Sequence, residues 1–152
     1  VPARSFGVDV PANVGADRGE RLREWARFRE EAERVLSAAI ARRGRVVHLS
    51  IHSFDPSLDA QRTYPMGVLF DPERRWEAAV AASLIGQLRR AGWDVRANEP
   101  YLGTDDGHTT ARRGQWGPEV YAGIEVELNQ GLDEAARQGI AAALEGWTPP
   151  AG

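Results

Sequence analysis

Short apolar segments alternate with amphipathic helical segments along the chain, and this alternation constrains the fold more than any other feature. Apolar residues recur at helical spacing in the expected helices, which span residues 17–44, 72–91 and 132–144. β-branched and apolar residues dominate the expected strands, which span residues 46–52, 66–70, 93–97 and 121–128. We therefore predict a three-layer α/β fold, with a mostly parallel or mixed central sheet and flanking helices.

The expected helix boundaries carry capping residues. Asp17 and Glu20 resemble a capping box at the start of the first helix, and Gly44 is a natural stop at its end. Asp71 is followed by Pro72, and proline is favoured at the first position of a helix. The second helix is therefore predicted to begin at Pro72.

The composition excludes several classes of protein. The chain has 152 residues, a net charge of −3 and no cysteine. This length predicts a single α/β domain over residues 1–152, and the charge provides no basic field that would hold nucleic acid. Disulfides, cysteine–zinc sites and thiol nucleophiles are excluded. Because no membrane-length apolar run and no signal-peptide pattern occur, we expect no membrane span and a cytoplasmic location.

Polar side chains that could carry chemistry lie toward the carboxyl ends of the predicted strands, where active sites of such sheets lie. His52 ends the first strand, and Asn98 and Tyr101 follow the third. Glu125 and Glu127 share one face of the fourth strand, because side chains alternate along a strand. A buried carboxylate costs on the order of several kcal/mol unless it is paired or protonated. Together these groups form a plausible hydrolytic constellation, although a structural role for the glutamates stays open.

The three histidines also have structural interpretations. His52 fits either a metal ligand or a hydrogen-bonded residue at a strand end. His48 lies four strand residues before it, about 13 Å away, so the two cannot bind one metal from that strand, and His48 is interpreted as structural. His108 falls in a loop and is interpreted as exposed. The chain contains no His-Glu-x-x-His motif, phosphate-binding loop, dinucleotide fingerprint or nucleophile elbow.

The order of several short motifs resembles the N-formylglutamate amidohydrolase family. These motifs are His52-Ser53-Phe54-Asp55-Pro56, Arg62, Gly67-Val68-Leu69-Phe70-Asp71, Asn98-Glu99-Pro100-Tyr101, Gly103, Asp106-Gly107, Thr109 and Ile124-Glu125-Val126-Glu127-Leu128-Asn129-Gln130. The resemblance covers the chain from about Arg4 to Gln130. It implies a fold similar to that of the zinc carboxypeptidases, with one catalytic Zn²⁺.

The resemblance also implies roles for individual residues. His52 matches the His-Ser-aromatic motif, whose histidine is a zinc ligand. Glu127 matches the carboxylate of the late strand, which is the general base. Glu125 lies two residues earlier and would be selected by a slipped alignment, so it is the second choice.

Four further residues are assigned to substrate binding. Arg4, followed by Ser5, resembles an Asn-Arg-Ser motif that holds a substrate carboxylate, although Ala3 replaces the asparagine. Arg62 matches an arginine in the loop after the histidine motif. Asn98 and Tyr101 belong to one motif, and the Tyr101 phenol lies where it could reach the reacting centre.

The implied activity is zinc-dependent hydrolysis of an N-acylated amino acid, with N-formylglutamate giving formate and glutamate. A carboxypeptidase-like peptidase, another deacylase and a non-catalytic relative that binds an acidic metabolite or a protein partner are the alternatives. The first zinc motif of the family lies upstream of the Asn-Arg-Ser region, whereas this chain starts at Val1. We therefore expect the C-terminal part of a longer amidohydrolase domain, an incomplete zinc ligand set, and self-association through an exposed edge strand.

Overall fold

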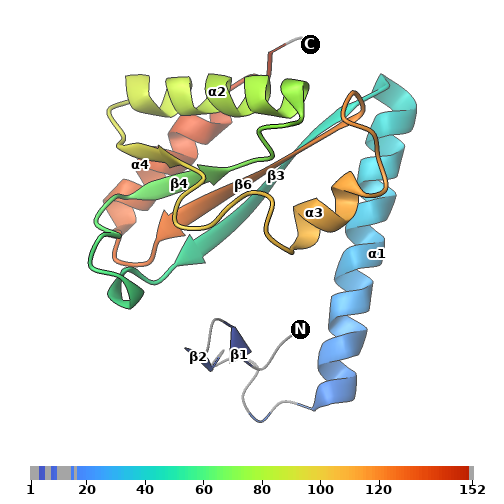
Figure 1. Ribbon diagram of the computed structural model, residues 1–152, viewed down its shortest axis with the longest axis horizontal. Coiled ribbons are helices and arrows are strands. Elements are labelled where there is room, and N and C mark those ends of the chain that lie inside the picture. The colour runs from blue at the N-terminus through green and yellow to red at the C-terminus, as the bar shows by residue number, and fades with distance from the viewer. Residues whose placement is uncertain (1–3, 6–7, 10–14, 16, 151–152) are drawn as a thin grey trace. The chain divides into compact units, whose positions relative to one another are not determined.

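The computed structural model describes residues 4–5, 8–9, 15 and 17–150 (Figure 1). The chain divides into two compact units, Val1–Gly44 and Arg45–Gly152. Among the described residues, no helix is long and apolar enough to cross a membrane. A single domain over residues 1–152 stays a prediction.

The first unit contains a short antiparallel strand pair, β1 (Arg4–Ser5) and β2 (Val8–Asp9), and the helix α1 (Arg18–Arg43). The Asp17 carboxylate accepts the Glu20 backbone N–H at 2.8 Å, which satisfies one donor of the first turn. Gly44 has a φ of 79° and donates its N–H to the Ile40 carbonyl, as a left-handed helix stop does. Both predicted boundaries of this helix are confirmed.

The second unit is built on a four-stranded mixed sheet with the order β3-β6-β4-β5. Its strands are β3 (Val46–Phe54), β4 (Met66–Leu69), β5 (Val95–Ala97) and β6 (Tyr121–Asn129). β6 runs parallel to β3 and antiparallel to β4, and β5 runs parallel to β4. β3 is an edge strand of this sheet, but self-association through it stays a prediction.

Two helices cover the apolar face of the sheet: α2 (Arg75–Arg90) and α4 (Glu134–Glu145) (Figure 1). The hydrophobic core lies between these helices and the sheet, and it contains Met66, Val68, Val80, Ala81, Leu84, Ile85, Leu88, Val95, Ala122, Ile124, Val126 and Ile140. The short helix α3 (His108–Arg113) and the loop before it lie on the opposite, polar face, while the 3-10 turn η2 (Pro56–Leu58) follows β3. The predicted three-layer α/β architecture with a mixed sheet is confirmed.

The start of α2 differs from the prediction, because the helix begins at Arg75 and not at Pro72. The Asp71 carboxylate accepts the Glu73 N–H at 3.0 Å, and the Asp71 carbonyl accepts the Arg74 N–H at 3.3 Å. Asp71 therefore closes a turn that precedes the helix. At the other end, Gly92 has a φ of 92° and stops α2 close to the predicted position.

Candidate active site

The register of the sheet places His52 beside Glu127. In the parallel pair of β3 and β6, His52 lies opposite Glu127 and Ser50 lies opposite Glu125. Register partners on adjacent strands point to the same face of a sheet. The imidazole and both carboxylates singled out in the sequence therefore share the polar face of the sheet.

Glu127 has the least solvated carboxylate of this group. Its side chain is 5% exposed, and within the described part of the chain its Oε2 atom has no hydrogen-bond partner. Burial, together with the negative charge of Glu125, raises the pKa of Glu127 to about 7, against an opposing effect of Arg62. A carboxylate that titrates near neutrality and keeps a free oxygen is a candidate general base.

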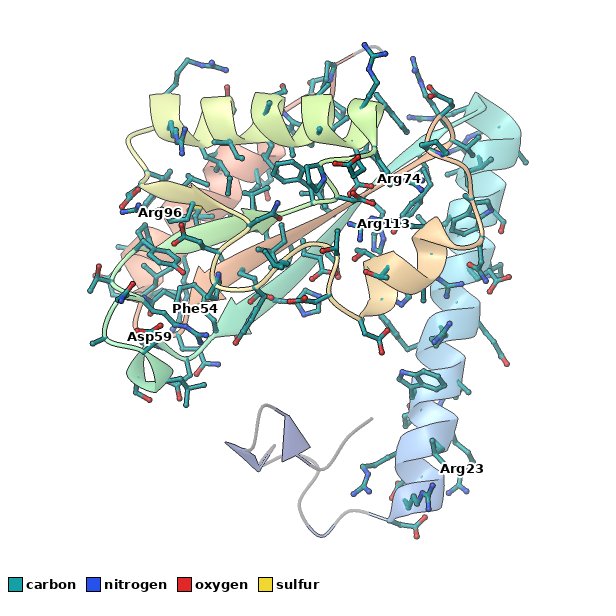
Figure 2. The ribbon with its side chains drawn as sticks, viewed as in Figure 1. Arg23, Phe54, Asp59, Arg74, Arg96 and Arg113 are labelled. Atoms are coloured by element: carbon teal, nitrogen blue, oxygen red, sulfur yellow. The ribbon has the colours of Figure 1, made fainter. Side chains whose placement is uncertain are left out.

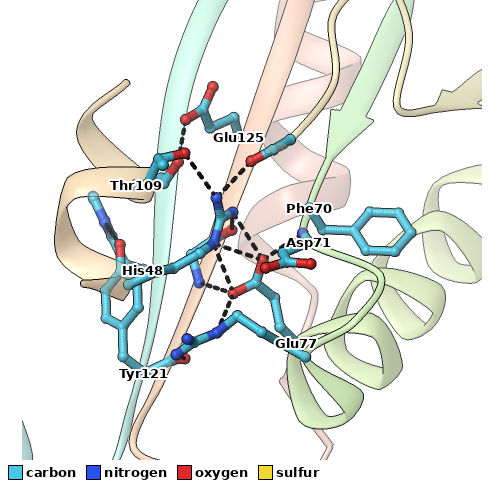
Figure 3. Close-up of polar contacts among 12 residues, drawn as sticks. His48, Phe70, Asp71, Glu77, Thr109, Tyr121 and Glu125 are labelled. Atoms are coloured by element: carbon cyan, nitrogen blue, oxygen red, sulfur yellow. Dashed lines mark hydrogen bonds and ion pairs between the residues drawn. The ribbon is translucent and has the colours of Figure 1, made fainter. Parts of the chain in front are cut away.

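Glu125 has a different environment, although it stands on the same strand face. Its Oε1 atom accepts a short hydrogen bond from the hydroxyl of Thr109, a fully buried residue of α3 (Figure 3). One carboxylate of the pair is thus held by a neighbour, while the other retains an oxygen without a partner.

The two strand histidines also differ. His52 is exposed, and its Nε2 atom lies 2.8 Å from the Ser50 hydroxyl. The Nδ1 atom of His48 lies 2.8 Å from the Tyr121 hydroxyl, and burial, helped by the nearby His108, lowers the pKa of His48 to about 4. His48 is therefore neutral at physiological pH.

The interpretation of His108 as an exposed loop residue is wrong. It begins α3 and is half-buried, with its ring edge-on to the ring of His48 at a centroid distance of 5.5 Å. The α3 segment can pack closely on the sheet because Gly123 of β6 has no side chain at this contact. A Cβ atom on Gly123 would lie only 3.1 Å from the Cβ atom of Thr109.

The described residues do not complete a zinc site. A catalytic zinc usually has three protein ligands and one water. No group of three or more His, Cys, Asp or Glu side chains in the described part of the chain lies close enough to hold a metal ion. His52 is accessible for ligation, but His48 lies four residues earlier on the same strand, and its Nδ1 atom contacts the Tyr121 hydroxyl.

Arg62 and Tyr101 lie together beside this face. The Arg62 Nη1 atom is 3.4 Å from the Tyr101 hydroxyl, and the guanidinium carbon lies 5.1 Å from the centroid of the tyrosine ring. Arg62 also lines a pocket of about 240 Å³, together with Asp59, Gln61, Tyr64, Glu99 and Pro100. The arginine therefore presents a cation at a cavity and remains near enough to Glu127 to affect its pKa.

The other two expected substrate-binding residues are placed differently. Asn98 has a φ of 52°, and its side-chain oxygen accepts the backbone N–H groups of Phe70 at 2.9 Å and Gly103 at 3.2 Å. This oxygen holds two loops together beside the sheet. Arg4 lies in β1 of the first unit, and its side chain falls outside the described residues.

Sequence reasoning missed a buried ionic network beside the site. Glu77 of α2 is fully buried, and its Oε1 atom lies 2.8 Å from Nη2 of Arg113, while Arg74 lies 3.5 Å from its Oε2 atom. The same carboxylate accepts the N–H groups of Asp71 at 2.7 Å and Gly123 at 3.0 Å (Figure 3). Arg74 and Arg113 lie close together, away from Phe54 at the carboxyl end of β3 (Figure 2).

This network could have been suspected from the sequence. Glu77 lies three residues before Val80 and seven before Leu84, so it occupies the apolar face of its helix. A charge at such a position needs a buried partner. The partner, Arg113, lies between the expected strands 93–97 and 121–128, and no local pattern pairs it with Glu77.

Comparisons with known proteins bear on the family and the fold of this chain. A family model described as N-formylglutamate amidohydrolase matches residues 10–132. The solved structure of gene product Atu2144 from Agrobacterium tumefaciens is similar to 95% of this chain, with 25% identity and a TM-score of 0.62, and the match covers 57% of that chain. No curated protein matches significantly.

A second solved structure, an N-formylglutamate amidohydrolase from Ralstonia eutropha JMP134, supports the fold. It is similar to 72% of this chain, with 21% identity and a TM-score of 0.53, and the match covers 42% of that chain. The present chain thus spans about half the length of these two structures.

Proposed function

Since the chain belongs to the N-formylglutamate amidohydrolase family, we propose that the protein hydrolyses the amide bond of an N-acylated amino acid, with N-formylglutamate as its substrate. The observation that carries the proposal is the state of Glu127. Its carboxylate is buried, has an oxygen without a partner, and titrates near neutrality. Such a group can accept a proton at physiological pH without being permanently protonated.

In the proposed reaction, Glu127 takes a proton from the water that attacks the acyl carbon. The same carboxyl group then gives a proton to the leaving nitrogen, so that the amine departs neutral. The products are a carboxylic acid, formate for a formyl substrate, and a free amino acid. This cycle returns Glu127 to its ionised form.

Arg62 and Tyr101 are proposed to bind the substrate. A guanidinium group can donate two parallel hydrogen bonds to a carboxylate, which fixes both position and orientation. Tyr101 restrains the Arg62 side chain through two contacts. Its hydroxyl lies within hydrogen-bond distance of Arg62 Nη1, and its ring packs against the guanidinium group. Asn98 would act indirectly, by holding the loop that carries Tyr101. The role of Arg4 stays a prediction from the family motif.

A substrate panel tests the proposed function. The full-length gene product is assayed with formyl-, acetyl- and succinyl-glutamate and with peptides that end in glutamate. Preference for N-formylglutamate is expected. Cleavage of the peptides alone would indicate a peptidase, and preference for another acyl group would indicate a different deacylase. Tight binding of these compounds without turnover would indicate a non-catalytic relative.

Zinc dependence belongs to the same proposal, with His52 as the protein ligand that this chain would contribute. Because no group of three or more possible ligands lies together among the described residues, we expect the 152-residue chain to bind zinc weakly or not at all. Equilibrium dialysis against micromolar zinc measures this, with His52→Ala as the matched variant. Tight, stoichiometric zinc in the chain would contradict the expectation and would point to replacement ligands. A cytoplasmic location also stays a prediction.

A further inference from the structure

Two carboxylates stand on one face of β6, although the proposed reaction uses only one. Glu125 and Glu127 are two residues apart, about 7 Å along a strand. Glutamate side chains are long, so an unrestrained Glu125 could turn toward the space beside Glu127. What distinguishes the two side chains is the contact of Glu125 with Thr109.

Thr109 is a rigid donor. The residue is 0% exposed, and its β-branched side chain has few conformations available. It sits directly on β6, since a Cβ atom on Gly123 would come within 3.1 Å of the Thr109 Cβ atom. The hydroxyl group is therefore fixed relative to the strand that carries both glutamates.

The helix that carries Thr109 is locked by a second contact one turn later. Arg113 donates from Nη2 to the Gly123 carbonyl at 2.8 Å and from Nη1 to the Gly103 carbonyl at 2.5 Å. The same guanidinium pairs with the buried Glu77. Thr109 and Arg113 thus hold one face of α3 against Gly123.

We propose that Thr109 is a positioning residue, which holds the Glu125 carboxylate toward α3 and so leaves Glu127 as the carboxylate of this pair that faces the substrate. This inference rests on the proposed function. Without the Thr109 hydroxyl, the Glu125 carboxylate turns toward Glu127. There it brings a second negative charge to the site and competes with the substrate for Arg62.

The first test uses Thr109→Val in the full-length protein, because valine keeps the branched shape and removes only the hydroxyl. We expect kcat for N-formylglutamate to fall about ten- to hundredfold, as small misplacements at an active site do. Thr109→Ser retains the hydroxyl and should keep most of the activity. A loss of equal size in both variants would overturn the inference, since it would show that packing and not the hydrogen bond matters.

The double variant Thr109→Val/Glu125→Gln gives the sharper comparison. If the damage comes from a released charge, the uncharged amide that replaces the Glu125 carboxylate should restore much of the lost kcat. A purely structural role for Thr109 predicts no recovery, and that result would overturn the proposal.

A crystal structure of Thr109→Val decides the question independently of any substrate. The Glu125 carboxylate should be turned away from α3, whereas an unchanged carboxylate would overturn the inference. If the wild-type protein cleaves none of the substrates, the proposed function fails, and this structure still shows whether Thr109 holds Glu125.

Discussion

Replacement of Glu127 by glutamine is expected to abolish hydrolysis of N-formylglutamate by the full-length protein. Glutamine preserves the shape of the side chain but cannot accept the proton of the attacking water. Loss of a general base usually lowers the rate about 10²–10⁴-fold. We expect the upper end of this range, because Glu127 is proposed to serve both the water and the leaving amine. Initial rates at saturating and limiting substrate measure the effect.

Glu125→Gln is the matched control, because it changes the neighbouring carboxylate on the same strand face. Its side-chain oxygen can still accept the Thr109 hydroxyl, so activity should be largely retained. If Glu125→Gln is inactive while Glu127→Gln keeps full activity, the two roles must be exchanged. If both variants remain active, the carboxylate pair is structural and the proposed mechanism fails.

The Glu127→Gln variant should also be more stable than the wild type at high pH. The unfolded chain ionises this carboxyl group at its ordinary pKa of 4.5, whereas the folded protein does so at about 7. Between these values the folded state binds more protons, so the wild type loses stability as the pH rises. The loss is complete above pH 7 and amounts to about 3 kcal/mol. Urea unfolding of both proteins at pH 4 and pH 8 should therefore show a higher free energy of unfolding for Glu127→Gln only at pH 8.

The sheet and its helices could be predicted because local patterns encode them. The apolar run that begins at Val46 and the helical repeat after residue 74 are each visible within a short window of sequence. The adjacency of His52 and Glu127 could not be predicted in the same way. It depends on the register between β3 and β6, which are separated in the chain by the whole β4–α2–β5 segment. The sequence predicts that His52 and Glu127 each lie toward the end of a strand. Only the pairing of β3 with β6 shows that the two side chains are neighbours.

The prediction is wrong at two places where a residue makes a contact that its neighbours in the sequence do not indicate. The sequence predicts Asp71 as a helix cap, but its backbone N–H donates to Glu77 and its carboxylate closes a turn. The sequence places His108 in an exposed loop, whereas α3 packs on the sheet at Gly123, a glycine fifteen residues later in the chain. The turn at Asp71 is local, whereas the contact between Thr109 and Gly123 joins α3 to β6, and the local sequence is compatible with either arrangement at both places.

The second large effect is expected at Glu77, which holds the ionic network beside the site. Glu77→Ala would leave the Arg113 guanidinium, only 7% exposed, without its carboxylate. It would also remove the acceptor for the N–H of Gly123, which has no register partner on β4 because that strand ends opposite Glu125. Removal of one partner of a buried ion pair costs about 3–5 kcal/mol. Chemical denaturation should therefore show a loss of this size in the free energy of unfolding.

Glu73→Ala is the control for this loss, since it removes an exposed carboxylate from the turn before the same helix. We expect that substitution to change stability by less than about 0.5 kcal/mol. The loss of stability in Glu77→Gln should lie between the losses in Glu77→Ala and Glu73→Ala. The amide oxygen of glutamine can still accept hydrogen bonds from backbone N–H groups, but it carries no charge. The network also fixes α3 through Arg113, so Glu77→Ala should lower activity at temperatures where the protein is still folded. A Glu77→Ala protein with wild-type stability would show that the pair is not needed to hold α3 on the sheet.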